Sequence, residues 1–452
     1  MVHFLSLRFQ TQISDNMEQT LTQSKAGQHI VWLDVARLVA MFTVVCCHSA
    51  DPFNFFPGTS PDIESIKFWG AAYGAVLRPC VPLFVMITGA LLLPVRGEAS
   101  VFYKKRIPRV FFPFIIWSLI YNFFPWITGL LGLNPEVILD FFPYSGEDVM
   151  RQSFAVSMGY IAQIPLNFSL LAVHMWYIYL LIGLYLYLPI FSAWVEKASE
   201  RAKLWFLAAW GVTLLLPYYN EYVSEYLWGG CSWNAFGMLY YFAGFNGYLL
   251  LGHYLRNHDW SGRQLAFIGM PMFVAGYAVT FLGFRHMTSL PDFTDEMLEL
   301  YFTYCSLNVV MMTVPVFVLC KRANIKSERV RRALANLTLC GFGVYMIHYF
   351  FYRTECGTDA RYPYSHSFAD TLCGSGGILC ILVSGSDGLS LFREEDEMGV
   401  GIGMLNYLSA FSTVRTFSAL SVRHCCTSCS HYGVHNLSRR YRTSSRRLGR
   451  RR

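Results

Sequence analysis

The stretch that decides the fold is "DVARLVAMFTVVCCHSAD", which runs from Asp34 to Asp51. It belongs to the first long apolar run of the chain, residues 31–50, yet it contains Arg37 and His48. A run of about 20 apolar residues is long enough to cross a hydrocarbon core of about 30 Å. A charged side chain inside such a run is costly and normally faces a protein-lined or wet cavity. The stretch therefore predicts a membrane-spanning helix with one polar face.

Similar apolar runs recur along the chain, and the composition agrees with them. The mean hydropathy is +0.35, and only 14% of the residues are charged, whereas a soluble protein carries about 25%. We expect an all-α, polytopic transmembrane helix bundle of nine or ten spans. The thirteen cysteines show no disulfide framework in the apolar part and are interpreted as packing residues. The expected spans are 31–50, 70–94, 110–133, 174–194, 204–217, 235–255, 264–284, 301–320 and 334–352.

The loops between these spans predict the orientation. With the N-terminus in the cytoplasm, the inner loops carry sixteen Lys and Arg residues and the outer loops carry three. Such a bias is typical of cytoplasmic loops. The segment 134–173 is expected to be an outer loop with interfacial or re-entrant pieces, and a further pair of spans is the alternative. The basic inner loops are 95–109, 195–203, 256–263 and 321–333.

The two ends of the chain differ from this central part. Residues 1–29 are polar and are expected to be a cytoplasmic segment without a cleavable signal peptide, followed by a transmembrane domain over 30–352. The tail, 353–452, carries thirteen arginines and no lysine, which favours a disordered or out-of-frame segment. The alternative is a natural basic tail that binds anionic lipid or nucleic acid. The cysteines and histidines of "HCCTSCSH" (424–431) match no standard zinc spacing, so no metal is expected.

The spacing within the first span suggests chemistry. Arg37 and His48 lie eleven positions apart, which is close to three helical turns, so they share one face about 16 Å apart along the axis. Asp34 is one turn from Arg37 and Asp51 is one turn from His48, where each carboxylate can orient its basic neighbour. The alternative is that Arg37 only reaches the interface and His48 only hydrogen-bonds within the bundle.

A second basic pair, Arg106 and Arg109, stands in "KKRIPRVFFP" at the inner end of the third span. We expect Pro108 to fix a helix start between them, because proline favours the first helical position. Helix N-termini and arginine side chains both suit phosphate. The alternative is ordinary positive charge of an inner loop, which we accept for Lys104 and Lys105.

Several motifs in order resemble those of the acyltransferase 3 family of membrane O-acyltransferases. They are Arg-x10-His in the first span, "RPCVPLFVMITGALLLP" (78–94), "KRIPRVFFPFIIW" (105–117), "HMWYIYLLIGLYLYLP" (174–189) and "GFGVYMIHYFF" (341–351). The resemblance extends over residues 30–352 and is greatest to members that O-acetylate surface glycans. The family pattern has one further span after "VYMIH", where this chain continues into its arginine-rich tail.

The resemblance implies a set of roles. His48 would be the catalytic residue, with Asp34 and Asp51 in support, and Arg37, Arg106 and Arg109 would engage the acyl-CoA donor. Residues Arg78, His174 and His348 also match the family pattern and are counted as substrate-binding or donor-binding candidates. For His174 and His348 the alternative is a histidine that only hydrogen-bonds between helices.

The implied donor is acetyl-CoA, and the implied acceptor is a glycan or lipid-linked glycan. The implied place is a bacterial inner membrane, in contact with lipid and without a nucleic-acid partner. A transporter or flippase of a lipid-linked sugar is the alternative function, because it would also bury Arg and His in a bundle.

Overall fold

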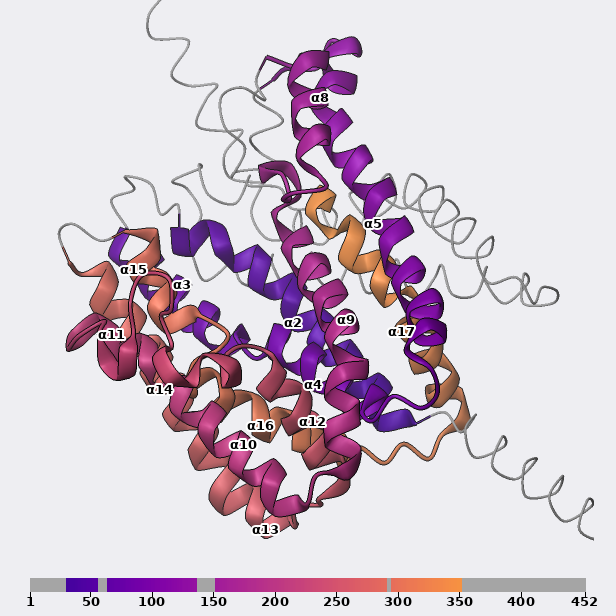
Figure 1. The fold of residues 1–452 in the computed structure, drawn as a ribbon. Helices are drawn as coiled ribbons and strands as arrows, with labels where there is room; N and C mark the ends of the chain where they lie inside the picture. The colour runs from indigo at the N-terminus through magenta and orange to yellow at the C-terminus, as the bar shows by residue number, and fades with distance from the viewer. Residues whose placement is uncertain (1–29, 56–62, 136–150, 291–293, 352–452) are drawn as a thin grey trace, which may run out of the picture.

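The computed structural model describes residues 30–55, 63–135, 151–290 and 294–351, and helices dominate these ranges (Figure 1). The polar segment 1–29 and the whole arginine-rich tail, 353–452, with its Cys/His cluster lie outside the described residues. The described helices are α2 (Val31–Phe55), α3 (Ile63–Leu77), α4 (Cys80–Leu92), α5 (Ala99–Leu130), α8 (Phe154–Gln163), η1 (Leu170–Met175), α9 (Trp176–Lys197), α10 (Glu200–Thr213), α11 (Leu216–Tyr222), η2 (Leu227–Gly229), η3 (Gly237–Phe242), α12 (Asn246–Asn257), α13 (Gly262–Gln264), η4 (Leu265–Gly269), α14 (Met270–Thr288), α15 (Asp295–Phe302), α16 (Leu307–Lys321), α17 (Glu328–Ile347) and η5 (His348–Phe351).

Seven helical stretches among the described residues are long and apolar enough to cross a membrane. This finding confirms an all-α, polytopic bundle. Two expected spans, 204–217 and 235–255, are instead built from short pieces, because α10 stops before α11 and η3 precedes α12. The seven stretches are Val31–His48, Lys67–Leu92, Ala99–Leu130, Leu170–Lys197, Gly262–Thr288, Met297–Lys321 and Glu328–Phe350.

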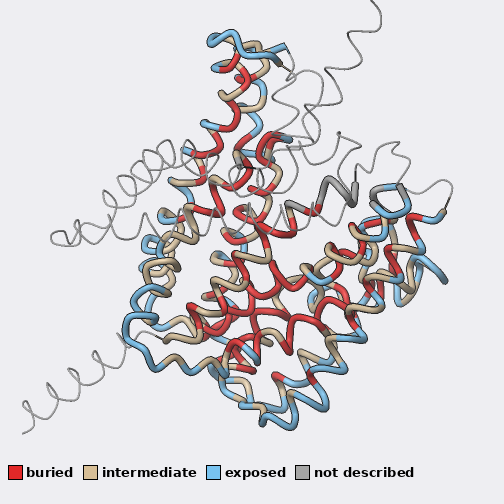
Figure 2. Tube along the Cα trace, turned by 180° about the vertical axis from the view of Figure 1, so that it is seen from behind, coloured by how far each residue is buried: buried red, intermediate tan, exposed pale blue. Residues whose placement is uncertain are grey.

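The helix α2 lies at the centre of the bundle and packs against α3, α4, α16 and α17 (Figure 1). Its buried face is lined largely by small side chains, which let neighbouring helices approach closely. The view coloured by burial shows the buried residues gathered where the helices cross, with exposed residues towards the periphery (Figure 2). The buried residues that form this face include Leu33, Ala36, Ala40, Val44 and Cys47.

The helices α4 and α12 make the closest backbone approach in this core, and two glycines permit it. A Cβ atom at Gly89 would collide with the backbone of Leu249, and one at Gly252 would collide with the backbone of Met86. Each helix thus presents a glycine to the backbone of the other. The hydrophobic driving force between helices is weak in lipid. Small residues at such crossings stabilise the helix pair by allowing close van der Waals packing.

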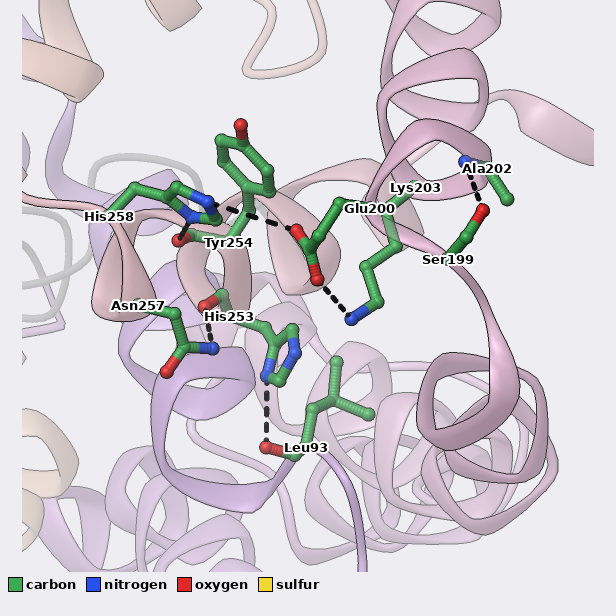
Figure 3. Close-up of polar contacts among 9 residues, drawn as sticks. All are labelled: Leu93, Ser199, Glu200, Ala202, Lys203, His253, Tyr254, Asn257 and His258. Atoms are coloured by element: carbon green, nitrogen blue, oxygen red, sulfur yellow. Dashed lines mark hydrogen bonds and ion pairs between the residues drawn. The ribbon is translucent and has the colours of Figure 1, made fainter.

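One end of the bundle gathers the basic loops, and Figure 3 shows part of it. Lys203 donates to Glu200 (2.9 Å), and His258 lies 3.9 Å from the same carboxylate. His253 Nδ1 hydrogen-bonds the carbonyl of Leu93 at 3.0 Å. The hydrogen bond from Lys203 holds the pKa of the exposed Glu200 carboxyl below its ordinary value. These contacts connect α10, α12 and the end of α4.

A fourth loop joins the same end. Lys321 lies 2.6 Å from Asp259 and donates to the carbonyl of Leu255 at 2.7 Å. Arg322 donates to the carbonyl of Trp260 at 2.8 Å. The ammonium of Lys321 lowers the pKa of the Asp259 carboxyl. The loops expected to be cytoplasmic therefore meet at one end, while the cytoplasmic assignment of that end stays a prediction.

The opposite end is held by fewer and different contacts. Arg285 at the end of α14 pairs with Glu64 at the start of α3 at 3.3 Å. The hydroxyl groups of Tyr222 and Tyr301 lie 2.8 Å apart. The start of α3 therefore lies beside the end of α14, and the end of α11 lies beside α15.

The expected outer loop contains a helix of its own. Ser153 caps α8, which packs along the far end of α5 (Figure 1). Phe154 meets Trp126 at 4.9 Å between ring centroids, and Gln152 donates to the hydroxyl of Thr128 at 3.1 Å. Residues 136–150 lie outside the described residues, so the rest of this loop stays a prediction.

The glycine crossing yields a stability prediction. Gly252→Ala places a methyl group against the backbone of Met86, and we expect the free energy of unfolding to fall by about 1–3 kcal/mol. The measurement is thermal unfolding of the purified protein in detergent. The control is Gly183→Ala in the exposed part of α9, where nothing lies within 4 Å of the added Cβ. Gly183→Ala should be neutral or stabilising by up to about 1 kcal/mol; equal effects of the two changes would contradict the crossing.

Candidate functional site

The helix α2 is continuous from Val31 to Phe55, so Arg37 and His48 share one face as the spacing predicts. Asp34 pairs with Arg37 at 3.2 Å, which confirms the expected contact one turn apart. The Asp34 side chain is 4% exposed and that of Arg37 is 36% exposed. The carboxylate is therefore buried, whereas the guanidinium reaches out of the bundle. The backbone of Asp51 belongs to α2, but its side chain lies outside the described residues.

The structure brings His48 together with the two other candidate histidines. His174 comes from η1 and His348 from η5, at the ends of the segments that precede α9 and follow α17. The ring centroids of His48 and His348 lie 5.3 Å apart, and those of His174 and His348 lie 4.9 Å apart. Three imidazoles from distant parts of the sequence thus form one cluster, in which His174 and His348 are buried and His48 is partly exposed.

Aromatic side chains enclose this imidazole cluster. Tyr349 stacks on His174 with centroids 4.2 Å apart and an interplanar angle of 22°. Its hydroxyl lies 3.3 Å from Nδ1 of His48. Tyr345 donates to the backbone carbonyl of His174, and Tyr121 donates to that of Met346 at 2.7 Å. The sequence assigns no role to any of the three tyrosines, although Tyr345 and Tyr349 stand in the motif 341–351.

The side chain of His174 has an unusual environment. It is 0% exposed, and neither ring nitrogen has a hydrogen-bond partner among the described residues. Leaving a buried polar group unsatisfied costs about 1–3 kcal/mol. Such groups concentrate where a ligand or water completes the hydrogen bonding. This environment suits a binding residue, and a binding role for His174 stays a prediction.

Three arginines gather at the other end of α2. The hydroxyl of Tyr185 on α9 lies within electrostatic range of Arg106, Arg37 and Arg109. Positive charge from α2 and α5 thus acts on the part of α9 that carries Tyr185. No group of three or more His, Cys, Asp or Glu side chains among the described residues is placed to hold a metal ion.

The expected helix start at Pro108 is wrong. The helix α5 begins at Ala99 with Glu98 as its N-cap, so Pro108 lies inside the helix. Arg106 and Arg109 consequently project from a helix interior and not from a helix N-terminus, and their side chains alone supply the positive charge. The residues before Pro108 stay helical in part because Tyr103 donates to the carbonyl of Leu186 at 2.9 Å and ties this turn to α9.

Arg78 lies apart from these three arginines. It stands at the break between α3 and α4, is buried, and donates to the carbonyl of Gly74 at 3.3 Å. Its guanidinium lies 4.0 Å from the ring centroid of Phe302. The side chains of Cys80 and Cys47 are within hydrogen-bonding distance. Since Cys80 is two residues from Arg78 and Cys47 directly precedes His48, Arg78 lies beside the half of α2 that carries His48.

With this geometry described, the comparisons identify the chain. A family model described as an acyltransferase domain, acyltransferase 3, matches residues 30–354. The chain belongs to the acyltransferase 3 family. It is therefore a multi-pass membrane protein and an O-acyltransferase in the general sense. Searches of curated proteins and of solved structures find no match.

The acyltransferase thus has two polar regions, and each includes one residue from the polar face of α2. The first, which we call the imidazole cluster, consists of His48, His174, His348 and Tyr349. The second, which we call the arginine cluster, consists of Arg37, Arg106 and Arg109. Both lie among the residues that the family model matches. About 16 Å of helix rise separates Arg37 from His48.

The different environments of His174 and His253 predict opposite effects on thermal stability when each histidine is replaced by phenylalanine. His174→Phe removes no hydrogen bond to a described residue and retains a ring against Tyr349. His253→Phe removes the hydrogen bond to the carbonyl of Leu93, which contributes about 1 kcal/mol. We expect the thermal unfolding midpoint in detergent to stay equal or rise for His174→Phe and to fall for His253→Phe. A larger loss of stability for His174→Phe would show that His174 is a packing residue.

Proposed function

We propose that this acyltransferase moves an acetyl group from acetyl-CoA, bound at the cytoplasmic side, to a hydroxyl of a cell-surface glycan or its lipid-linked precursor. The proposed location is the plasma membrane of a bacterium. The observation that carries the proposal is the polar face of α2, with Arg37 near one end and His48 near the other. The basic loops lie at one end of the bundle, and that end is assigned to the cytoplasm.

The arginine cluster is suited to the phosphates of the donor. A guanidinium presents a planar fork of donors that matches two phosphate oxygens, and it stays charged at all relevant pH values. The pairing of Arg37 with Asp34 (3.2 Å) leaves the guanidinium half-exposed and limits its orientation. Lys104 and Lys105 are exposed and are assigned to the charge of the inner loop.

The imidazole cluster is suited to the acyl transfer itself. His48 takes the proton of the acceptor hydroxyl while its oxygen attacks the carbonyl carbon of the thioester. The new C–O bond forms, the C–S bond breaks, and the imidazolium returns the proton to the departing thiolate. The products are the acetylated hydroxyl and free coenzyme A. The acetyl group reaches the acceptor side while the coenzyme stays at the arginine cluster.

His174 and His348 are assigned to the acceptor side of this reaction. The His174 nitrogens, which lack hydrogen-bond partners among the described residues, are suited to donate to the acceptor oxygen or to the thioester oxygen as negative charge develops. Donors fixed in a water-poor site stabilise such charge strongly. Asp51 lies one turn beyond His48 in the sequence and stays a proposed supporting residue.

The first test of the proposed function is His48→Ala. Inverted membrane vesicles expose the cytoplasmic face to [14C]acetyl-CoA, and label in the glycan fraction and release of coenzyme A thiol are measured. We expect both to fall by about 100-fold or more, since loss of a general base typically costs 10²–10⁴-fold. A transporter of lipid-linked sugars, the alternative function, would release no coenzyme A.

The matched control for this test is His286→Ala. His286 is an exposed histidine in the last turn of α14, and its replacement should leave acetyl transfer unchanged. Unfolding midpoints of both variants should equal that of the wild type. Retention of more than about a tenth of the activity in His48→Ala would exclude His48 as the base.

The second test concerns the donor. We expect Arg106→Ala/Arg109→Ala to weaken acetyl-CoA binding by about tenfold or more, because two charge-assisted contacts are lost. Lysine at both positions should restore only part of the affinity, since it lacks the bidentate fork. The control is Lys104→Ala/Lys105→Ala, which removes equal charge from the same helix. The affinity for acetyl-CoA is measured by isothermal titration calorimetry of the purified protein. Equal affinities in the two double variants would show that the arginines contribute only the ordinary positive charge of an inner loop.

A further inference from the structure

Tyr349 touches every imidazole of the cluster. Its ring centroid lies 4.2 Å from that of His174, 5.1 Å from that of His348 and 5.2 Å from that of His48. The residue is 3% exposed, so its ring is held on several sides. A side chain enclosed in this way keeps one rotamer. The position of its hydroxyl is therefore fixed relative to His48.

The contact between this hydroxyl and His48 has a chemical consequence. The two nitrogens of a neutral imidazole have different roles, since one carries the proton and the other accepts one. The hydrogen bond at one nitrogen decides which nitrogen is left as the base. The Tyr349 hydroxyl lies 3.3 Å from Nδ1 of His48. If Nδ1–H donates to the phenol oxygen, Nε2 is the nitrogen that accepts a proton.

We propose that Tyr349 is a positioning residue for His48. Its hydroxyl oxygen accepts a hydrogen bond from Nδ1–H of His48 and leaves Nε2 to face the acceptor hydroxyl, while its ring holds His174 by stacking. Tyr349 thereby fixes the tautomer of one imidazole and the place of another. This inference rests on the proposed function, in which His48 is the general base. The reacting bonds are those of that reaction, and Tyr349 itself neither gains nor loses a covalent bond.

The neighbouring tyrosines do not take this role. The Tyr345 hydroxyl donates to the backbone carbonyl of His174, and the Tyr121 hydroxyl donates to that of Met346 at 2.7 Å. Both hydroxyls are thus engaged with the backbone, that of Tyr345 at η1 and that of Tyr121 at the last turn of α17. Tyr349 is the tyrosine whose hydroxyl is shown at a nitrogen of His48. Its role is therefore tied to the chemistry of that ring.

The test is Tyr349→Phe, which keeps the ring and the stacking and removes only the hydroxyl. Proteoliposomes of purified protein receive acetyl-CoA and a glycan extract, and coenzyme A release is followed. We expect kcat to fall about tenfold, which corresponds to the loss of one hydrogen bond in the transition state. The KM for acetyl-CoA should stay unchanged, because the arginine cluster lies at the other end of α2.

The matched control is Tyr248→Phe. Tyr248 is equally buried and donates to the carbonyl of Tyr304 at 2.6 Å, so its replacement also removes one hydrogen bond from a tyrosine. Its kcat should equal that of the wild type. If Tyr349→Phe retains the wild-type kcat, or if its KM rises in proportion to the loss, the positioning role is wrong.

A double variant separates this inference from the function on which it rests. In the His48→Ala background, Tyr349→Phe should cause no further loss, because residues that act through one group are not additive. A further tenfold loss would assign Tyr349 an independent role and overturn the proposal. If His48→Ala itself keeps its activity, the proposed function fails first. If His48→Ala is inactive while Tyr349→Phe is fully active, only the positioning role fails.

A spectroscopic measurement does not depend on turnover. In protein labelled with 15N-histidine, the His48 signals are identified by their loss in His48→Ala. We expect the Nδ1-protonated tautomer in the wild type and a mixture in Tyr349→Phe, since the hydrogen bond selects the tautomer. The same tautomer in both proteins, or Nε2 protonation in the wild type, would overturn the proposal.

Discussion

The structure depends on enclosing the ionic end of one membrane helix. The ion pair of Asp34 and Arg37 (3.2 Å) cannot face lipid without a cost of several kcal/mol, so α2 needs protein on the side that carries it. The helices α3, α4, α16 and α17 supply that protein. The same requirement applies to His48 three turns later. The central place of α2 therefore follows from its polar residues as much as from its apolar ones.

One of the helices that pack against α2, α4, is itself closely packed against α12. Gly89 and Gly252 let the backbones of α4 and α12 touch. Contacts such as that of His253 with the carbonyl of Leu93 then join α12 to the end of α4. The histidines of the imidazole cluster belong to three segments that are far apart in the sequence. The cluster therefore forms only when helix packing brings these segments together.

Much of the architecture could be predicted from the length of the apolar runs and the positive charge of the loops. Both features are set by the membrane and do not depend on contacts between particular residues. The Arg37–His48 face could be predicted because it depends only on helical geometry. The break at Arg78 has a local signal, because Pro79 disfavours a helical backbone at the residue before it. The start of α5 at Ala99 could not be predicted, since α5 accommodates Pro108 in its interior. Tyr349 stands in the motif 341–351, but its contact with His48 could not be predicted, because the two residues lie 301 positions apart.

The prolines of α5 have a mechanical consequence. Pro113 and Pro125 lie inside this 32-residue helix, and each lacks the N–H that would bond the carbonyl four residues earlier. Those carbonyls belong to Arg109, in the arginine cluster, and to Tyr121, beside the imidazole cluster. Helices bend most readily at such positions. With Pro108, which also lies inside α5, the helix therefore lacks backbone hydrogen bonds beside both polar regions, and these are the places where its axis is least constrained.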